Sequence, residues 1–554
     1  MQPTHCYAEM LVYMPQANMY IIECKSPEQH NKMPECKRLI VGITPSLVLL
    51  NDLKSGNVLD IRRRCKPGKC LDVNAYGVYG MIAIYKCIYL VLIVDRTNVG
   101  KMYEHFVYEI EKVEIVQIQG PEEEEHGREI MNMKRILENS GIYYSEYPLH
   151  KSMSIQNSDD DFLFNLMPRK AFIEYTKDNR DDCIVFLVSC IQGFFGAGDY
   201  QSMCIRLVSR RSQRRIGTRY FSRGADAQGH VSNYVETEQF VYNGEKTTSY
   251  MQVRGSIPLG WQHEIGYRYN PKIVVKDEKV FAAADDVLVK KYGDVLYLNL
   301  IRHSGYEGLL HDAYKRQLAA NSKEAVHFNF SEEENELTEV FRQKMILLVN
   351  GTLGKQGYFD STGFQKGVIR TNCIDCLDRT NVSQFIIGSA VLERQLSDFE
   401  CEGKDVLREM YSNLWMQNGH SLSRQYAGSL ALKSHFLNGN TRKIVSRLSD
   451  MAKSLRRYIV NRFSDAGRHA AYHIITSDCS RGGTATLDST MMKTKLPLGI
   501  QLAIAVIALF LWLSIILWCI YTQYMPHIDF ETVLRAILYE PEVYFIGEEV
   551  AVND

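Results

Sequence analysis

The sequence predicts a mixed α/β (α+β) protein with a β-rich N-terminal subdomain, a second subdomain of strands and helices, and a C-terminal membrane-spanning helix. Three observations carry this prediction. The chain has 554 residues, which is too many for one compact core. Its apolar pattern changes near residue 185 from strand-like runs to a mixture of strand-like and helix-like runs. Residues 502–520 form an almost wholly apolar stretch without a charged side chain.

The N-terminal subdomain is expected to span residues 1–185. Its runs at 37–43, 46–52 and 87–94 have the length and composition of strands. The acidic stretch 121–130 is expected to begin a solvent-exposed helix that interrupts these strands. This part of the chain is therefore predicted to be mainly β structure.

The second subdomain is expected to span residues 186–465 and to mix strands with helices. Asn243-Gly244 lies between two β-prone runs and predicts a hairpin. Residues 294–301 predict another strand. Residues 332–349 and 444–463 carry apolar side chains at three- and four-residue spacing, which is typical of helices.

The C-terminal region predicts a linker, a membrane anchor and a tail. Residues 466–495 are rich in Ser, Thr and Gly, as flexible linkers are. Residues 496–521 contain the apolar stretch, which at ~1.5 Å per residue is long enough to cross a bilayer core of ~30 Å. Lysines precede this helix and acidic residues follow it, so the positive-inside rule places residues 1–495 in the cytosol and the short acidic tail 522–554 across the membrane. A buried core helix is the alternative interpretation.

Composition and charge exclude several classes of protein. The formal net charge of −1 argues against a nucleic-acid-binding protein that relies on bulk electrostatics. The 14 cysteines have no regular spacing, which indicates reduced thiols in the cytosol. Cys373 and Cys376 form a C-x-x-C pair, but no second pair or matching histidines accompany it. We therefore expect neither a metal site nor a cofactor.

The chemically most informative stretch is RTNCIDCLDRTN, residues 370–381. Five residues separate Cys373 from Arg379, and a loop of that length can point its backbone N–H groups at a tetrahedral phosphate beside the N-terminus of a helix predicted over 380–395. The same positive field lowers the pKa of the thiol, and the thiolate is the nucleophile. Arg379 can bind two phosphate oxygens and stabilise the transition state, and Thr380 can hydrogen-bond the sulfur.

This stretch resembles the signature of the Sac (suppressor-of-actin) family of phosphoinositide phosphatases. Blocks at 209–239, 252–261 and 424–433 also resemble that family, and the similarity is closest to its integral-membrane branch of the endoplasmic reticulum and Golgi. The resemblance implies a metal-independent Sac domain, facing the cytosol from those membranes. It implies hydrolysis of phosphatidylinositol 4-phosphate, and of other monophosphates such as phosphatidylinositol 3-phosphate, to phosphatidylinositol through a cysteinyl-phosphate intermediate.

The expected partners are a phosphoinositide lipid in a membrane, the anionic membrane surface and trafficking adaptor proteins, with no nucleic acid. A dense basic run is expected to supply part of the patch that docks on the anionic surface. Its members are Arg206, Arg210, Arg211, Arg214 and Arg215.

Two carboxylates within the loop are candidates for the proton donor to the leaving inositol oxygen. Asp375 is favoured over Asp378, a structural role for either is equally open, and Asp360 is a candidate from outside the loop. The acidic residues make the loop less basic than a polyphosphate site, which agrees with a monophosphate substrate. The expected catalytic residues are Cys373, Arg379, Asp375 and Asp378, and the expected substrate-binding residues are Ile374, Cys376, Leu377, Thr380, Asn381 and Arg370.

Several alternatives stay open at the level of sequence. The region after residue 521 lacks the second apolar helix of the integral-membrane branch, so one membrane pass and two are both considered. Asn372 stands where protein tyrosine phosphatases have a histidine, which disfavours a membrane-bound protein phosphatase. A phosphoinositide-binding scaffold without turnover would not require both Cys373 and Arg379. A reversible disulfide between Cys373 and Cys376 that protects the nucleophile is a further hypothesis.

Overall fold

The computed structural model describes four short strands before residue 50 and residues 73–119, 121, 126–138, 140–156, 160–175, 186–264, 268, 270–330, 339–432, 437 and 444–477. The chain forms one compact unit of Met1–Arg442 with Lys453–Thr486 and a second of Lys443–Ala452 with Leu487–Asp554. Of the second unit, the described residues are 444–452, which form the beginning of helix α11 (Ile444–Phe463). The described strands all belong to the first unit.

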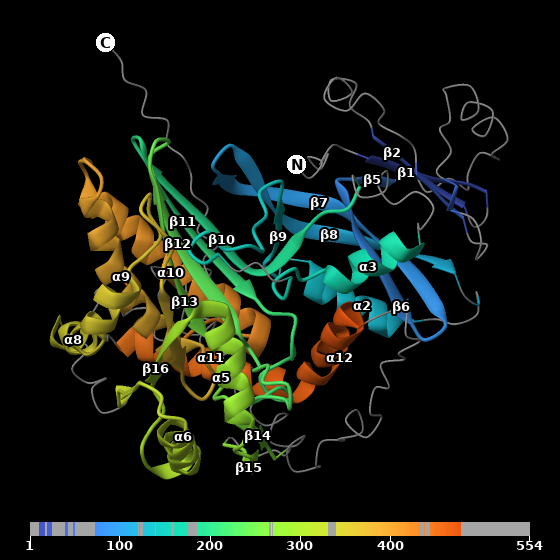
Figure 1. The fold of residues 1–554 in the computed structure, drawn as a ribbon. Helices are drawn as coiled ribbons and strands as arrows, with labels where there is room; N and C mark the ends of the chain where they lie inside the picture. The colour runs from blue at the N-terminus through green and yellow to red at the C-terminus, as the bar shows by residue number, and fades with distance from the viewer. Residues whose placement is uncertain are drawn as a thin grey trace, which may run out of the picture. The chain divides into compact units, whose positions relative to one another are not determined.

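The first unit is built on an eleven-stranded mixed sheet (Figure 1). Its strands follow the order β17-β16-β18-β13-β12-β11-β10-β9-β8-β7-β6. Neighbours from β6 to β13 run antiparallel, whereas β13, β18, β16 and β17 run parallel. The bounds are β6 (Gly77–Ile84), β7 (Cys87–Met102), β8 (His105–Gln119), β9 (Ile142–Ser145), β10 (Cys190–Tyr200), β11 (Met203–Arg211), β12 (Val235–Tyr242), β13 (Thr247–Arg254), β16 (Asp294–Asn299), β17 (Ala325–His327) and β18 (Gly367–Asn372).

Two smaller antiparallel sheets accompany the large one. One has the order β4-β3-β2-β1-β5, and the other pairs β14 with β15. Their bounds are β1 (Met10–Gln16), β2 (Met19–Cys24), β3 (Leu39–Gly42), β4 (Val48–Leu49), β5 (Val73–Ala75), β14 (Gly260–His263) and β15 (Ile273–Asp277).

The described helices besides α11 pack against these sheets. Their bounds are α2 (Gly127–Leu137), α3 (Leu166–Tyr175), α5 (Val280–Tyr292), the 3-10 helix η3 (Gly305–Glu307), α6 (Gly308–Ala320), α8 (Glu339–Gln356), α9 (Asp378–Ser397), α10 (Lys404–Ala427) and α12 (Asp465–Thr476).

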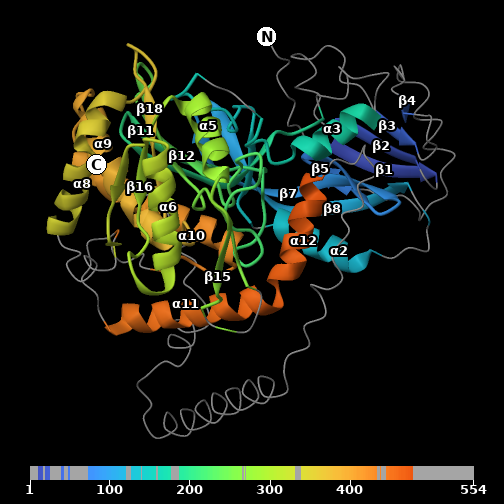
Figure 2. The same cartoon turned by 60° about the horizontal axis from the view of Figure 1, so that its bottom comes forward.

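The parallel strands are buried on both faces. On β16, Leu296 belongs to the core formed with α8, α9 and α10, while its neighbour Tyr297 belongs to the core formed with α5 and α6. On β18, Ile369 belongs to the first of these cores and Val368 to the second. Because successive side chains of a strand point to opposite faces, helices cover this part of the sheet on both sides, as Figure 2 shows. Such a sheet leaves the carboxyl ends of its strands free for a binding site.

Several predicted elements are confirmed. β12 and β13 pair from Val235–Arg254 to Tyr242–Thr247, and Gly244 in the turn has φ +89°, which glycine adopts without strain. The strand predicted at 294–301 is β16, and the helix predicted at 444–463 is α11. The helix predicted at 332–349 is described from Glu339, as α8, and continues to Gln356.

Two expectations about domain organisation need correction. The boundary expected at residue 185 falls within a continuous sheet, because β9 before it pairs with β10 after it. The linker expected at 466–495 is wrong for its first part, which is α12. Tyr472 and Ile475 of α12 are fully buried in a core shared with α2 and the strands of the N-terminal region. Apolar contact therefore holds this segment against the N-terminal strands, while residues 478–495 lie outside the described part.

Among the residues that the structure describes, no helix has both the length and the apolar character needed to cross a membrane. The anchor predicted at 496–521 and the tail at 522–554 lie outside those residues. Both stay predictions.

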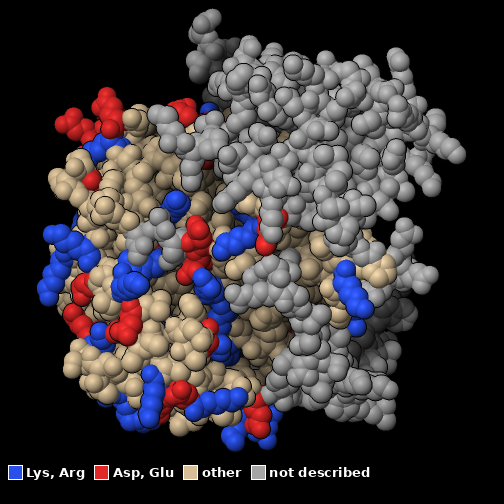
Figure 3. Space-filling model, turned by 45° about the vertical axis from the view of Figure 1, so that its right-hand side comes forward, with Lys and Arg blue, Asp and Glu red and all other residues tan. Residues whose placement is uncertain are grey.

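The docking patch expected in the basic run is wrong for three of its arginines. Arg206, Arg210 and Arg211 lie on β11 and are at most 3% exposed. Arg210 Nε donates to Glu236 Oε2 at 2.8 Å, and its Nη2 donates to Glu238. A buried charge is tolerated only when it is paired, so the acidic residues of the neighbouring β12 explain why Arg210 is inside. Arg206 pairs with Asp199 instead, and Arg211 donates to Gln192 and Tyr472. On the face drawn in Figure 3, the described surface carries basic and acidic side chains interspersed.

Candidate active site

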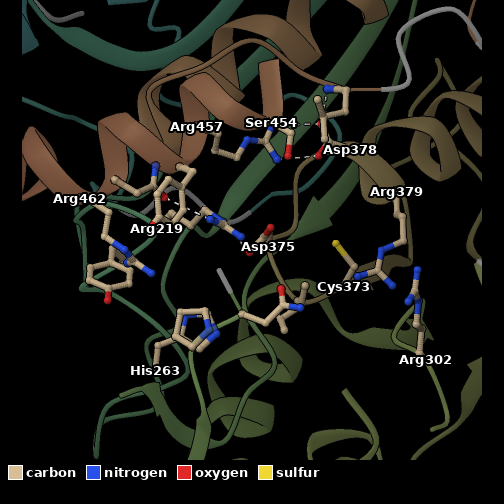
Figure 4. A pocket seen from close by; sticks show the side chains of 17 residues that line it. Arg219, His263, Arg302, Cys373, Asp375, Asp378, Arg379, Ser454, Arg457 and Arg462 are labelled. Carbon is tan, nitrogen blue, oxygen red and sulfur yellow. Dashed lines mark hydrogen bonds and ion pairs between the residues drawn. The ribbon is translucent and has the colours of Figure 1, made fainter. Parts of the chain in front are cut away.

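A cavity of about 260 Å³ lies at the carboxyl end of β18 (Figure 4). Segments that are far apart in the chain line it, among them the loop after β18 and the second half of α11. The lining residues are Arg219, Tyr220, His263, Asn270, Pro271, Arg302, Cys373, Ile374, Asp375, Asp378, Arg379, Leu432, Ser454, Arg457, Tyr458, Asn461 and Arg462.

The predicted phosphate loop connects β18 to α9. The strand ends at Asn372 and the helix begins at Asp378, so residues 373–377 turn between a parallel strand and a helix N-terminus. This bears out the helix predicted over 380–395. Cys376 has φ +53°, a left-handed conformation that costs a non-glycine residue energy and is typical of tightly constrained turns at sites. The unpaired N–H groups of the helix N-terminus favour a negative charge at the loop.

Cys373 sits at the start of this loop and is 2% exposed. Its sulfur accepts hydrogen bonds from the Cys376 N–H at 3.0 Å and from the Thr380 hydroxyl at 3.4 Å. Burial by itself raises the pKa of the thiol, but the Cys376 hydrogen bond, the Arg379 charge and the Thr380 hydroxyl outweigh it and lower the pKa to about 6. The thiolate is therefore the main form at pH 7, and it is a competent nucleophile.

Cys376 behaves differently from its neighbour. Its Sγ donates to the Gly255 carbonyl at 2.8 Å, and burial together with the nearby Cys373 raises its pKa well above the usual value. Both cysteines are free in the structure. The hypothesis of a disulfide between them stays a prediction.

Arg379 is held by an acidic residue that no sequence motif indicates. Its Nη1 and Nη2 donate to the Glu307 carboxylate at 3.0 and 2.6 Å, and Nη1 also donates to the Leu300 carbonyl at 2.9 Å. A bidentate pair of this kind fixes the plane of the guanidinium. In Figure 4, Arg379 and Arg302 lie together beside Cys373. Glu307 is therefore a positioning residue for the arginine of the loop.

Asp375 lies between two guanidinium groups. Arg219 Nε lies 2.9 Å and Arg223 Nη2 2.7 Å from its Oδ1. Burial raises the pKa of Asp375, but the charges of Arg219 and then Arg223 outweigh burial and hold the pKa well below the usual value. In this arrangement Asp375 is an ionised acceptor. Its expected role as a proton donor therefore requires that a guanidinium first be drawn away from it.

Asp378 ties the loop to α11. Its Oδ2 accepts a hydrogen bond from Arg457 Nη1 at 2.9 Å, and its Oδ1 accepts one from the Leu432 N–H at 2.6 Å. These bonds match the structural role that the sequence leaves open for Asp378 beside proton donation. The third candidate, Asp360, does not line the cavity, and its carboxylate accepts a hydrogen bond from the Thr362 N–H at 2.7 Å.

The expected substrate-binding residues divide into two groups. Ile374 lines the cavity, and Thr380 reaches the sulfur of Cys373. Arg370 is fully buried instead and donates to the Ser256 carbonyl at 2.6 Å and to Asn372 Oδ1 at 3.1 Å. Its role is thereby corrected, because these acceptors hold its guanidinium behind the loop.

The other three of these residues also lie behind the cavity lining rather than in it. They are Cys376, Leu377 and Asn381. Leu377 packs with Tyr426 and Ala427, and Asn381 Nδ2 donates to the Trp415 carbonyl at 3.0 Å. These side chains support the loop.

The cavity is more basic than its loop alone. Its charged lining residues are Arg219, Arg302, Arg379, Arg457, Arg462, Asp375 and Asp378. Burial, followed by the charge of Arg223, lowers the pKa of His263 to about 2, so this histidine is neutral at pH 7. Since arginines outnumber carboxylates, the cavity attracts an anion. The charges within the loop therefore understate how basic the site is.

Comparison with known proteins identifies the family of this chain. Residues 76–338 match the sequence model of the SacI homology domain. The chain is 32% identical over 469 residues to the phosphoinositide phosphatase SAC6 of Arabidopsis thaliana, covering 74% of this chain and 78% of that relative. The chain belongs to the Sac phosphoinositide phosphatase family. The chain is also 32% identical over 434 residues to the phosphoinositide phosphatase SAC7 of the same plant, covering 70% of this chain and 71% of that relative. It is 28% identical over 425 residues to the phosphatidylinositol-3-phosphatase SAC1 of Drosophila melanogaster, covering 69% of this chain and 71% of that relative.

The partners of the Sac loop come from distant parts of the chain. Arg219 and Arg223 lie within the block at 209–239 that resembled the family, but nothing in that block assigned them to Asp375. Glu307 and Arg457 stand 72 and 79 residues from their partners and belong to no motif. Glu307 is a lone charge on an otherwise ordinary segment, and Arg457 is one of several basic residues of its helix, so neither carries a specific sequence signal.

The Cys373 thiol of this Sac protein should titrate near pH 6. We expect its rate of alkylation by iodoacetamide to rise with pH around a midpoint of about 6. Thr380→Val should move the midpoint upward, because it removes a hydrogen bond that favours the thiolate. Mass spectrometry of the Cys373 peptide measures both rates, with Thr362→Val as the control outside the cavity. A midpoint at the ordinary thiol value of ~8.5 would contradict a stabilised thiolate at Cys373.

Removing the negative charge of Glu307 should impair turnover. In Glu307→Gln the guanidinium of Arg379 loses its fixed plane, and we expect kcat for a phosphomonoester substrate to fall by about 10- to 100-fold. Glu307→Asp keeps the charge, so its kcat should lie between that of Glu307→Gln and that of the unchanged chain. Glu278→Gln is the matched control, since it breaks the ion pair with the exposed Arg316 and should leave kcat unchanged. An undiminished kcat in Glu307→Gln would rule out the positioning role.

Proposed function

We propose that this chain hydrolyses the phosphomonoester of phosphatidylinositol 4-phosphate, and of other monophosphates such as phosphatidylinositol 3-phosphate, to phosphatidylinositol. The observation that carries the proposal is a buried Cys373 thiol with its pKa lowered to about 6, in an arginine-lined cavity. Membership of the Sac family supports a phosphoinositide as the substrate class. The Drosophila relative, named a phosphatidylinositol-3-phosphatase, supports a monophosphate.

The proposed reaction has two steps at phosphorus. In the first, the Cys373 thiolate attacks, an S–P bond forms, and the P–O bond to the inositol ring breaks as the leaving oxygen takes up a proton. Arg379 and the loop N–H groups stabilise the charge on the equatorial oxygens. In the second, water attacks the cysteinyl phosphate and loses a proton, the S–P bond breaks, and inorganic phosphate leaves with the thiolate restored.

We assign the proton delivery to Asp375, under one condition set by its surroundings. Arg219 and Arg223 hold the carboxylate ionised in the absence of substrate. A phosphate dianion that enters the cavity competes for the lining Arg219, and a guanidinium drawn toward phosphate no longer depresses the pKa of Asp375. Substrate binding would in this way prepare the carboxylate to carry a proton.

Asp375→Asn should therefore slow some substrates far more than others. We expect a loss of roughly 10²- to 10⁴-fold on an inositol phosphate ester, whose alkoxide needs a proton. An aryl phosphate with an acidic phenol releases its phenolate without a proton donor. The rate on that substrate should therefore fall much less. Asp378→Asn is the comparison variant, because a structural defect should slow both substrates alike. Equal losses in Asp375→Asn would assign Asp375 a structural role.

The activity itself is tested with the full chain in detergent and EDTA, on short-chain phosphatidylinositol 4-phosphate and on a phosphotyrosine peptide. We expect phosphate release from the lipid only, and its loss in Cys373→Ser, because a hydroxyl is a far weaker nucleophile than a thiolate. Release from the peptide alone would favour a membrane-bound protein phosphatase. Lipid binding without release from either substrate would favour a scaffold.

The same proposal includes anchoring by residues 496–521 in endoplasmic reticulum and Golgi membranes, with the Sac domain in the cytosol and trafficking adaptors as secondary partners. The support for it is the apolar stretch 502–520 and the resemblance to the integral-membrane branch of the family. Protease treatment of sealed microsomes checks the orientation. Protection of the Sac domain from an external protease would contradict it.

A further inference from the structure

Helix α11 exposes a row of apolar side chains. Leu455, Ile459 and Phe463 are 58%, 46% and 49% exposed. They follow one another at four-residue spacing and therefore share one face of the helix. Single exposed apolar residues are common on protein surfaces, but three on consecutive turns of one helix form a continuous stripe. We call these three residues the α11 stripe.

The α11 stripe borders the active-site cavity. Ser454, Tyr458 and Arg462 line that cavity, and each immediately precedes a residue of the stripe. Neighbouring residues of a helix are turned by ~100° from each other, so the lining face and the stripe adjoin. Figure 4 shows Ser454, Arg457 and Arg462 reaching the cavity from α11.

The charges of this segment all have one sign. Residues 453–463 contain Lys453, Arg456, Arg457 and Arg462 and no acidic residue. Arg457 points inward to Asp378, whereas Arg456 is exposed directly beside Leu455. A helix with an apolar stripe and cationic flanks is the chemistry that suits the interface of an anionic bilayer, where apolar side chains enter between headgroups and cations meet lipid phosphates.

We propose that the α11 stripe is a membrane-docking surface, which inserts into an anionic bilayer and brings the mouth of the cavity to its lipid. The inference rests on the proposed function, because a substrate that stays embedded by its acyl chains must be reached at the membrane surface. It replaces the docking patch expected in the basic run, whose arginines on β11 are buried. The ion pair between Arg457 and Asp378 joins the docking helix to the phosphate loop.

The first test needs no catalysis. The full chain is reconstituted into phosphatidylcholine vesicles with and without phosphatidylserine, and Phe463→Trp is probed with brominated lipid. We expect quenching beyond that of the unchanged chain, stronger when phosphatidylserine is present. Leu347→Trp is the matched control, because Leu347 is an exposed apolar residue on α8, at 78% exposure. Leu347→Trp should add no quenching to that of the unchanged chain.

The second test separates docking from chemistry. The three substitutions Leu455→Gln, Ile459→Gln and Phe463→Gln together should raise KM for phosphatidylinositol 4-phosphate in vesicles by at least about tenfold. Turnover of the soluble short-chain lipid should not change. The control on α8 combines Leu347→Gln with Leu348→Gln and should alter neither quantity.

Distinct outcomes overturn distinct claims. Absence of quenching at position 463, or an unchanged KM on vesicles, refutes the docking surface. Shielding of the Phe463→Trp side chain from both lipid and aqueous quenchers shows that a protein surface covers the stripe, and this also refutes it. No turnover of either substrate by the unchanged chain removes the proposed function, while the quenching result still decides whether α11 touches lipid.

Discussion

The site depends on one constraint: an ionised sulfur must be kept inside the protein. Cys373 is almost fully buried, and burial alone would keep it a thiol. Three groups reverse that preference and lower the pKa of the thiol: hydrogen bonding from Cys376, the charge of Arg379 and the Thr380 hydroxyl. Each needs a special backbone or a fixed side chain. Stabilising one buried charge therefore accounts for three features of the site. These are the left-handed backbone at Cys376, the helix that begins after the loop, and the ion pair between Glu307 and Arg379.

Much of this arrangement could be predicted because it is local in the sequence. The hairpin at Asn243-Gly244, the strand β16 and the helix α11 follow from turn chemistry and periodicity within one segment. The loop between β18 and α9 follows from the spacing of Cys373 and Arg379. What pairs with the loop could not be found in this way, since Glu307 is brought to Arg379 only by the folded sheet. Periodicity shows which face of an element is apolar, but it does not show which distant charge that element will meet.

Two wrong expectations have a common cause. The sequence predicts the arginines of β11 at the surface because charged side chains are normally solvated, yet the register with β12 places Glu236 and Glu238 where they neutralise Arg210. The composition of residues 466–476 predicts a linker, although Tyr472 and Ile475 have the helical spacing that lets both enter a core. In each case the partner surface, which lies far away in sequence, decided the outcome.

The pairing of β9 with β10 also limits where recombination can divide such a chain during evolution. Cutting the chain between these strands would expose two sheet edges, each with unsatisfied N–H and C=O groups that can recruit another molecule. The return of α12 to the N-terminal core makes the two parts depend on each other a second time. Recombination that separated them would yield fragments prone to aggregate, so selection should preserve the whole stretch from β6 to α12 as a single evolutionary module.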